Sequence, residues 1–139
     1  MADWYGSARS NYFRVKDIGK FRDWVKSIPG LVLMESALAD KIGLVGIYSE
    51  DFFGGWPDTS REIDVYYEFD LLTELGKHLV DGEVAILREI GAEKLRYLTG
   101  WSGAITNKGK PVYVNLNDIY EKAAKKFKIP NSSIIECTY

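Results

Sequence analysis

The side chains that could act as acids or as metal ligands are concentrated in the middle of the chain. Asp64 and Glu68 share the polar side of a predicted strand, and Asp70 follows that strand directly. Carboxylates that converge in this way could hold Mg²⁺ for a hydrolase or transferase reaction. A hydrated acidic face is the more ordinary interpretation, because exposed carboxylates are common on strands. We therefore expect a protein that is not an enzyme and keep the Mg²⁺-dependent reaction as an alternative.

Other chemistry lacks its usual partners in this sequence. His78 is the single histidine and Cys137 the single cysteine, too few for a usual zinc ligand set and without a motif for a catalytic dyad or triad. We expect His78 to be solvated or at the edge of the core, and Cys137 to pack as a small apolar residue. No phosphate-binding glycine motif accompanies them. The prediction is therefore no catalytic residue, no metal and no cofactor.

Charge is strongly segregated along the 139 residues. Residues 50–93 hold 12 acidic and three basic residues, a net charge of −9, whereas residues 1–49 carry +2 and residues 94–139 carry +5. A field of one sign attracts a partner of the opposite sign. The sequence therefore predicts a small non-enzymatic binding protein whose acidic surface blocks a basic, nucleic-acid-handling host protein.

An aromatic loop lies inside this acidic segment. Phe52, Phe53 and Trp56 stand among glycines and a proline, and such rings either tuck against the core or project as binding anchors. The tucked arrangement is slightly favoured, because three exposed rings invite aggregation. The predicted partner-binding surface consists of Glu50, Asp51, Phe52, Phe53, Trp56, Asp58, Glu62, Asp64, Tyr66 and Glu68.

The basic ends support a different alternative, a nucleic-acid-binding module. Arg9, Arg14 and Lys16 surround two aromatic residues, and four lysines mark the last predicted helix. The acidic pI of about 5.5 makes direct nucleic-acid binding the less favoured interpretation. A homodimer formed through the final strand, or through Tyr66 and Trp56, is also open.

Size and composition indicate one domain over residues 1–139, because 139 residues with 46% hydrophobic content suffice for one core. No apolar run reaches the length of a membrane span. The first residues lack the basic and apolar stretches of a signal peptide, so we expect none. Together with the single cysteine, this favours a cytoplasmic location.

Hydrophobic periodicity predicts a mixed order of strands and helices. Asp17, Asp70 and Asn117 are the expected helix N-caps, and the last helix should bury Ile119, Tyr120, Ala123 and Phe127. The expected elements are a strand at 11–15, a helix at 18–28, strands at 31–35, 42–48 and 62–69, a helix at 71–79, a hairpin of 83–90 and 94–105 turning at Gly91-Ala92, a strand at 112–114, a helix before Pro130 and an edge strand at 134–139.

This order favours an α+β fold in which a mainly antiparallel sheet has its helices packed on one face. A ferredoxin-like βαββαβ core with extra strands and a C-terminal helix is the preferred architecture. A curved sheet wrapped around its helices is the alternative.

Two stretches, residues 4–17 and residues 91–100, resemble short uncharacterised proteins carried by plasmids, phages and other mobile elements of bacteria. The resemblance implies a context and assigns no active-site residue. Small accessory proteins of mobile elements often bind and block host defence proteins such as restriction or CRISPR nucleases. The chain is accordingly expected to be an accessory or anti-defence protein of this kind.

Overall fold

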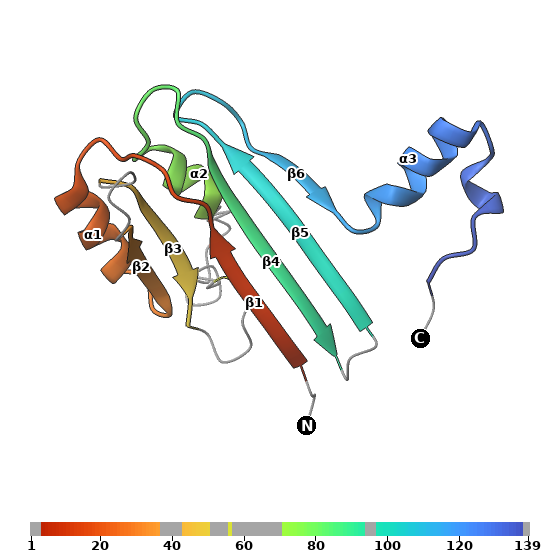
Figure 1. Cartoon of the computed structure of the whole chain (residues 1–139), viewed down its shortest axis with the longest axis horizontal. Helices are drawn as coiled ribbons and strands as arrows, with labels where there is room; N and C mark the ends of the chain where they lie inside the picture. The colour runs from red at the N-terminus through yellow and green to blue at the C-terminus, as the bar shows by residue number, and fades with distance from the viewer. Residues whose placement is uncertain (1–3, 37–42, 51–55, 57–70, 94–96, 138–139) are drawn as a thin grey trace, which may run out of the picture.

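The computed structural model describes residues 4–36, 43–50, 56, 71–93 and 97–137 of the chain. The described part forms six strands and three α-helices, followed by a short 3₁₀ helix (Figure 1). In chain order these are β1 Trp4–Ser10, α1 Ile18–Lys26, β2 Leu31–Glu35, β3 Val45–Ser49, α2 Leu71–Gly76, β4 Ala85–Glu93, β5 Tyr97–Ile105, β6 Val112–Asn115, α3 Asp118–Phe127 and the 3₁₀ helix Asn131–Ser133.

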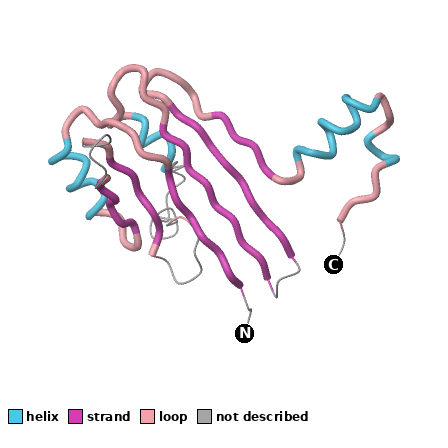
Figure 2. The backbone as a smooth tube through the Cα atoms, viewed as in Figure 1, coloured by secondary structure: helices cyan, strands magenta, loops and turns pink. Residues whose placement is uncertain are grey.

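All six strands belong to one sheet in the order β2-β3-β1-β4-β5-β6 (Figure 2). Every pairing between neighbours is antiparallel. The first four strands with α1 and α2 follow the chain order βαββαβ, and β1 lies between β3 and β4. This arrangement is ferredoxin-like. The hairpin of β4 and β5 and the edge strand β6 extend it, so the predicted fold class is confirmed.

The core lies between α1, α2 and one face of the sheet. Phe21 and Val25 of α1 meet Ile47 of β3 and Leu87 of β4 in one buried cluster. The helix α1 begins as its sequence predicts, because the Oδ1 atom of Asp17 accepts a hydrogen bond from the Lys20 N–H at 3.1 Å. Local sequence and tertiary packing therefore agree for this helix.

The strand predicted at 11–15 is wrong, since β1 ends at Ser10. The Asn11 side chain takes the place of further strand pairing: its Nδ2 donates to the Val84 carbonyl and its Oδ1 accepts from the Ile86 N–H. Beyond it, Phe13 and Val15 form only isolated bridges. An asparagine side chain that satisfies main-chain groups competes in this way with a regular ladder.

The turn predicted at Gly91-Ala92 is also wrong, because β4 continues through both residues to Glu93. Gly91 pairs with Gly6 and Ala92 with Tyr5, so β1 holds this part of β4 straight. The helix α2 ends at Gly76, whereas the sequence predicted that it would continue to residue 79. The backbone of Gly76 lies close to that of Thr106: a Cβ atom at Gly76 would be 2.9 Å from the Thr106 carbonyl oxygen. The predicted strand at 62–69 and the predicted cap Asp70 lie outside the described residues.

The C-terminal region differs most from the prediction. Among the described elements, α3 packs mainly on the 3₁₀ helix, and Figure 1 shows it standing off beyond the end of β6. Ile119 is 60% exposed and Phe127 is 67% exposed, so the predicted inner face is uncovered at both positions. The Asn117 side chain makes no cap hydrogen bond. Residues 134–137, expected in an edge strand, form no strand. Helices therefore cover one face of the sheet only through α1 and α2.

Within the part of the chain described above, no helix has the length and apolar character needed to cross a membrane.

Candidate functional site

The predicted partner-binding surface lies mostly outside the described residues. Two of its ten members are described. Glu50 is exposed just after β3, and its N–H donates to the Gly30 carbonyl at 2.7 Å. Trp56 is half-buried. The other eight, Asp51, Phe52, Phe53, Asp58, Glu62, Asp64, Tyr66 and Glu68, fall in the undescribed stretches.

Trp56 is fixed to the sheet by a carboxylate. Glu89 of β4 accepts a hydrogen bond from the Trp56 N–H at 2.7 Å and another from the Trp101 Nε1–H at 2.5 Å. Both indole rings pack against the core cluster, so Trp56 is tucked and does not project. Its own Nε1 is buried without a hydrogen-bond partner among the described residues. Glu89 therefore connects Trp56 to β4 and β5.

Three other carboxylates of the acidic segment form ion pairs. Glu74 pairs with Lys77 at 2.9 Å, Glu83 with Arg14 at 3.3 Å, and Asp81 with Lys108 at 3.6 Å. Arg14 and Lys108 belong to the basic ends of the sequence, which partly neutralise the segment here. Glu50, by contrast, has an exposed side chain, and none of the ion pairs among the described residues involves it.

His78 lies at the edge of the core, as expected from the sequence. Its ring centroid is 4.9 Å from that of Trp24 and 5.5 Å from that of Phe21. Burial lowers the pKa of His78 below its usual value, and the nearby Glu74 carboxylate partly opposes that shift. Cys137 is exposed rather than packed. No group of three metal-ligating side chains gathers within the described ranges.

A second candidate surface, which the sequence did not predict, is the face of β4, β5 and β6 opposite the core. Side chains alternate between the faces of a strand, so residues next to the buried Ala85, Leu87 and Ile105 point away from α1 and α2. We call five exposed residues on this side the apolar strip: Ile90, Leu98, Val112, Val114 and Leu116, which are 48–68% exposed.

Two shallow hollows lie along the apolar strip, and Ile90 and Leu116 line both. One of about 260 Å³ reaches Arg88 and Val114, and one of about 420 Å³ reaches Leu98. Gly100 shapes them, because a Cβ atom there would be 3.3 Å from Leu116 Cγ. The missing side chain lets Leu116 lie flat on the sheet.

Two arginines border the apolar strip. Arg9 of β1 is the register partner of Arg88 of β4, and both side chains are exposed. Like charges directly opposite each other destabilise a strand pair. No carboxylate among the described residues pairs with either guanidinium. The pair therefore forms a cationic spot able to hold an anionic group.

Part of the apolar strip could have been predicted from the sequence. Val112, Val114 and Leu116 alternate, which is the pattern of a strand with one apolar side. Arg9 could not be placed beside Arg88, because the residues that form β1 carry no clear strand pattern.

Comparisons with known proteins identified no relative of the chain. No protein-family model matches the chain, and neither a curated protein nor a solved structure matches it.

Proposed function

We propose that this chain is a small non-enzymatic binding protein that occupies the basic surface of a nucleic-acid-handling host protein. The observation that carries the proposal is the −9 net charge of residues 50–93. A surface field of that size speeds the encounter with a basic partner. The resemblance to proteins of bacterial mobile elements supports an accessory, anti-defence role. Location in the cytoplasm of the host cell belongs to the same proposal.

Three described residues of the acidic segment are anchored to the folded core, which supports this proposal. Glu50 bonds to Gly30 at the end of β3, Trp56 bonds to Glu89, and Leu71 is 8% exposed at the start of α2. Groups that are held in place before a partner binds lose less conformational entropy on binding, so the anchored Glu50 and Trp56 suit a role in docking.

The test uses bacterial proteins that bind a DNA-cellulose column. The purified chain should capture a member of this fraction after nuclease treatment. Association is then measured for the wild type and for the triple variant Glu62→Gln, Asp64→Asn, Glu68→Gln. Electrostatic steering raises association rates about 10- to 1,000-fold, so the variant should associate roughly tenfold more slowly at low salt.

A matched control removes the same number of charges from carboxylates that are already paired. The variant Glu74→Gln, Asp81→Asn, Glu83→Gln has the same net charge as the test variant, but each of its carboxylates has a basic neighbour. It should slow association much less. Equal rates for the wild type and the test variant would refute the proposal.

The cationic spot favours a second candidate function, direct binding of a nucleic acid. Arg9 and Arg88 could contact the phosphates of a nucleic-acid backbone. A single-stranded oligonucleotide should then be retarded in a gel, and less so at higher salt. Arg9→Gln with Arg88→Gln should abolish the shift, whereas Lys20→Gln with Lys26→Gln on α1 should preserve it. Retardation of the wild type that the arginine variant retains would exclude this site.

A further inference from the structure

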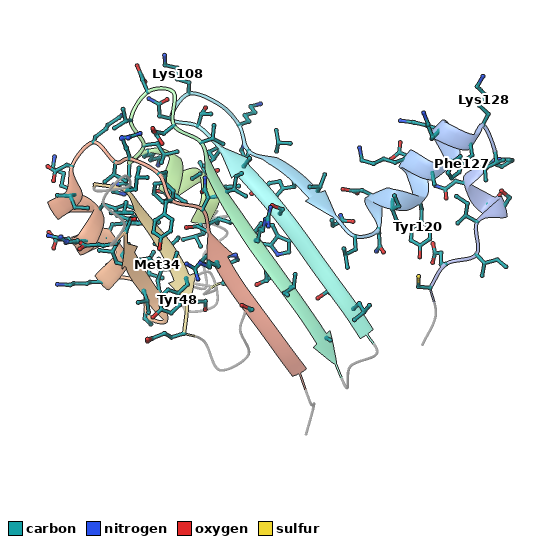
Figure 3. The ribbon with its side chains drawn as sticks, in the orientation of Figure 1. Met34, Tyr48, Lys108, Tyr120, Phe127 and Lys128 are labelled. Carbon is teal, nitrogen blue, oxygen red and sulfur yellow. The ribbon has the colours of Figure 1, made fainter. Side chains whose placement is uncertain are left out.

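The C-terminal arm, residues 117–137, carries an apolar surface that its own fold does not cover. α3 is amphipathic, with Ile119, Ala123 and Phe127 along one line at i, i+4 and i+8. Figure 3 shows Tyr120 and Phe127 on this helix, away from the strands. The tail covers one side of the apolar face, where the Cys137 N–H donates to Tyr120 Oη at 2.8 Å. Ile119 and Phe127 remain largely exposed.

The junction between β6 and α3 holds the arm away from its own sheet. The Leu116 N–H donates to the Gly100 carbonyl at 3.1 Å, which fixes the end of the strand on β5. Asp118 Oδ2 accepts from the Asn115 N–H at 2.7 Å, and the Ile119 N–H donates to the Leu116 carbonyl at 3.4 Å. Only two residues, Leu116 and Asn117, connect β6 to α3. Folding α3 back onto the apolar strip of the same copy would therefore break these hydrogen bonds.

An open space also lies between the arm and the sheet. A hollow of about 560 Å³ lies there, lined by Leu98 and Leu116 on the sheet side and by Ile119 and Tyr120 on the arm side. The apolar strip and the exposed side of α3 thus border the same open space without covering each other. A second chain has room to enter it.

We propose that two copies of the chain form an exchange dimer, in which the arm of each copy packs on the apolar strip of the other. The two surfaces are chemically matched, since both present aliphatic or aromatic side chains. The two contacts are related by a twofold axis, the commonest symmetry of homo-oligomers. This inference is independent of the acidic segment and of the proposed host partner.

The apolar area available to such a dimer approaches that of a standard interface. Each copy contributes seven large side chains that are roughly half exposed or more, five from the apolar strip and two from the arm. Each can lose roughly 50 Å² of exposed surface, which gives on the order of 700 Å² for both copies. Standard interfaces bury about 1,600 Å², of which about 60% is apolar. The remaining roughly 260 Å² of apolar area has to come from apolar atoms of neighbouring residues, and the polar part of the interface from backbone and polar groups.

The test measures the molar mass of the full-length chain by light scattering during size-exclusion chromatography. The wild type should be a dimer. Phe127→Asp damages only the arm, and Val114→Asp damages only the apolar strip on the edge strand β6. Each variant should raise the dimer dissociation constant at least about tenfold. Lys110→Asp, at an exposed position outside both surfaces, is the matched control and should stay dimeric.

Mixing the two variants distinguishes exchange from other dimers. The Val114→Asp copy still has an intact arm, and the Phe127→Asp copy still has an intact strip, so a mixed pair recovers one complete contact. The mixture should therefore contain dimers that neither variant forms alone at the same concentration. Circular dichroism of each variant checks that the fold is kept, and Ile119→Asp with Leu98→Asp repeats the test if either is unfolded.

Each other outcome overturns the proposal. A wild type that remains monomeric at about 100 µM shows that the surfaces do not associate. If Val114→Asp leaves the dimer intact, the arms pack on each other. If Phe127→Asp leaves it intact, two sheets associate through their strips or through the edges of β6. A mixture of the two variants that fails to form dimers excludes reciprocal exchange.

Discussion

The carboxylate of Glu89 offers the sharpest test of how Trp56 is attached to the sheet. Its two oxygens accept hydrogen bonds from the Trp56 main chain and from the Trp101 indole. Glu89→Ala removes both acceptors and leaves two half-buried N–H groups without them. When a half-buried N–H group loses its acceptor, the folded protein becomes less stable, because water replaces the lost hydrogen bond only in part.

The size of the loss follows from these two bonds. A hydrogen bond to a charged group contributes about 1.5–3 kcal/mol to stability. Because Glu89 is only half-buried, we take the lower end for each bond, which gives a loss of about 3 kcal/mol in the free energy of unfolding. For a chain of this length that corresponds to a fall in Tm of roughly 12 °C. Glu89→Gln keeps one acceptor and should lose about half as much.

Urea unfolding followed by tryptophan fluorescence measures the effect, since Trp56 and Trp101 both report on this cluster. Glu50→Ala removes an exposed carboxylate of the same segment and should change stability by less than about 0.5 kcal/mol. A double-mutant cycle with Trp101→Phe should give a coupling energy of about 1.5 kcal/mol. If Glu89→Ala is as stable as Glu50→Ala, the carboxylate does not stabilise the Trp56–Trp101 cluster and the reasoning fails.

Two further predictions concern the core. Gly103→Ala places a Cβ atom 2.7 Å from Leu72 Cδ2 and should lower the free energy of unfolding by about 1–3 kcal/mol, whereas the roomier Gly109→Ala should change it little; equal stabilities would contradict the packing. Because burial lowers the pKa of His78, the unfolded chain binds its proton more readily, so stability is complete above about pH 6.5 and falls as the pH drops from there through the lowered pKa. His78→Phe should remove this part of the pH dependence in unfolding curves at several pH values, and an unchanged pH profile would assign it to other groups.

The elements predicted correctly are those whose cause lies within a few residues. Asp17 caps α1, and Phe21 and Val25 recur at helical spacing, so this helix follows from local sequence. The strand β1 does not, since Trp4–Ser10 contains mainly small and polar residues. It forms because Ala8 lies opposite Glu89 across a long antiparallel ladder. A strand of that kind depends on partners that are distant in the chain, so the residues of the strand alone do not predict it.

The candidate sites divide in the same way. The sequence indicated the acidic segment through its net charge, which needs no geometry. It could not indicate that Glu83 and Asp81 pair with Arg14 and Lys108, because those partners are remote in the chain. Nor could it indicate the cationic spot at Arg9, which depends on the register of β1 against β4.

The C-terminal region shows what an amphipathic pattern does and does not determine. Ile119 and Phe127 predicted a helix with an apolar face, and the helix is present. The pattern requires that this face be covered, but it does not say by which chain. Val114 and Leu116, a few residues earlier, form a second apolar surface that is also exposed. The hydrogen-bonded turn at Asp118 keeps the two apolar surfaces apart within one copy. The two surfaces are held apart within one copy by the turn at Asp118, but they can cover each other between two copies, and this is the basis of the proposed exchange of arms.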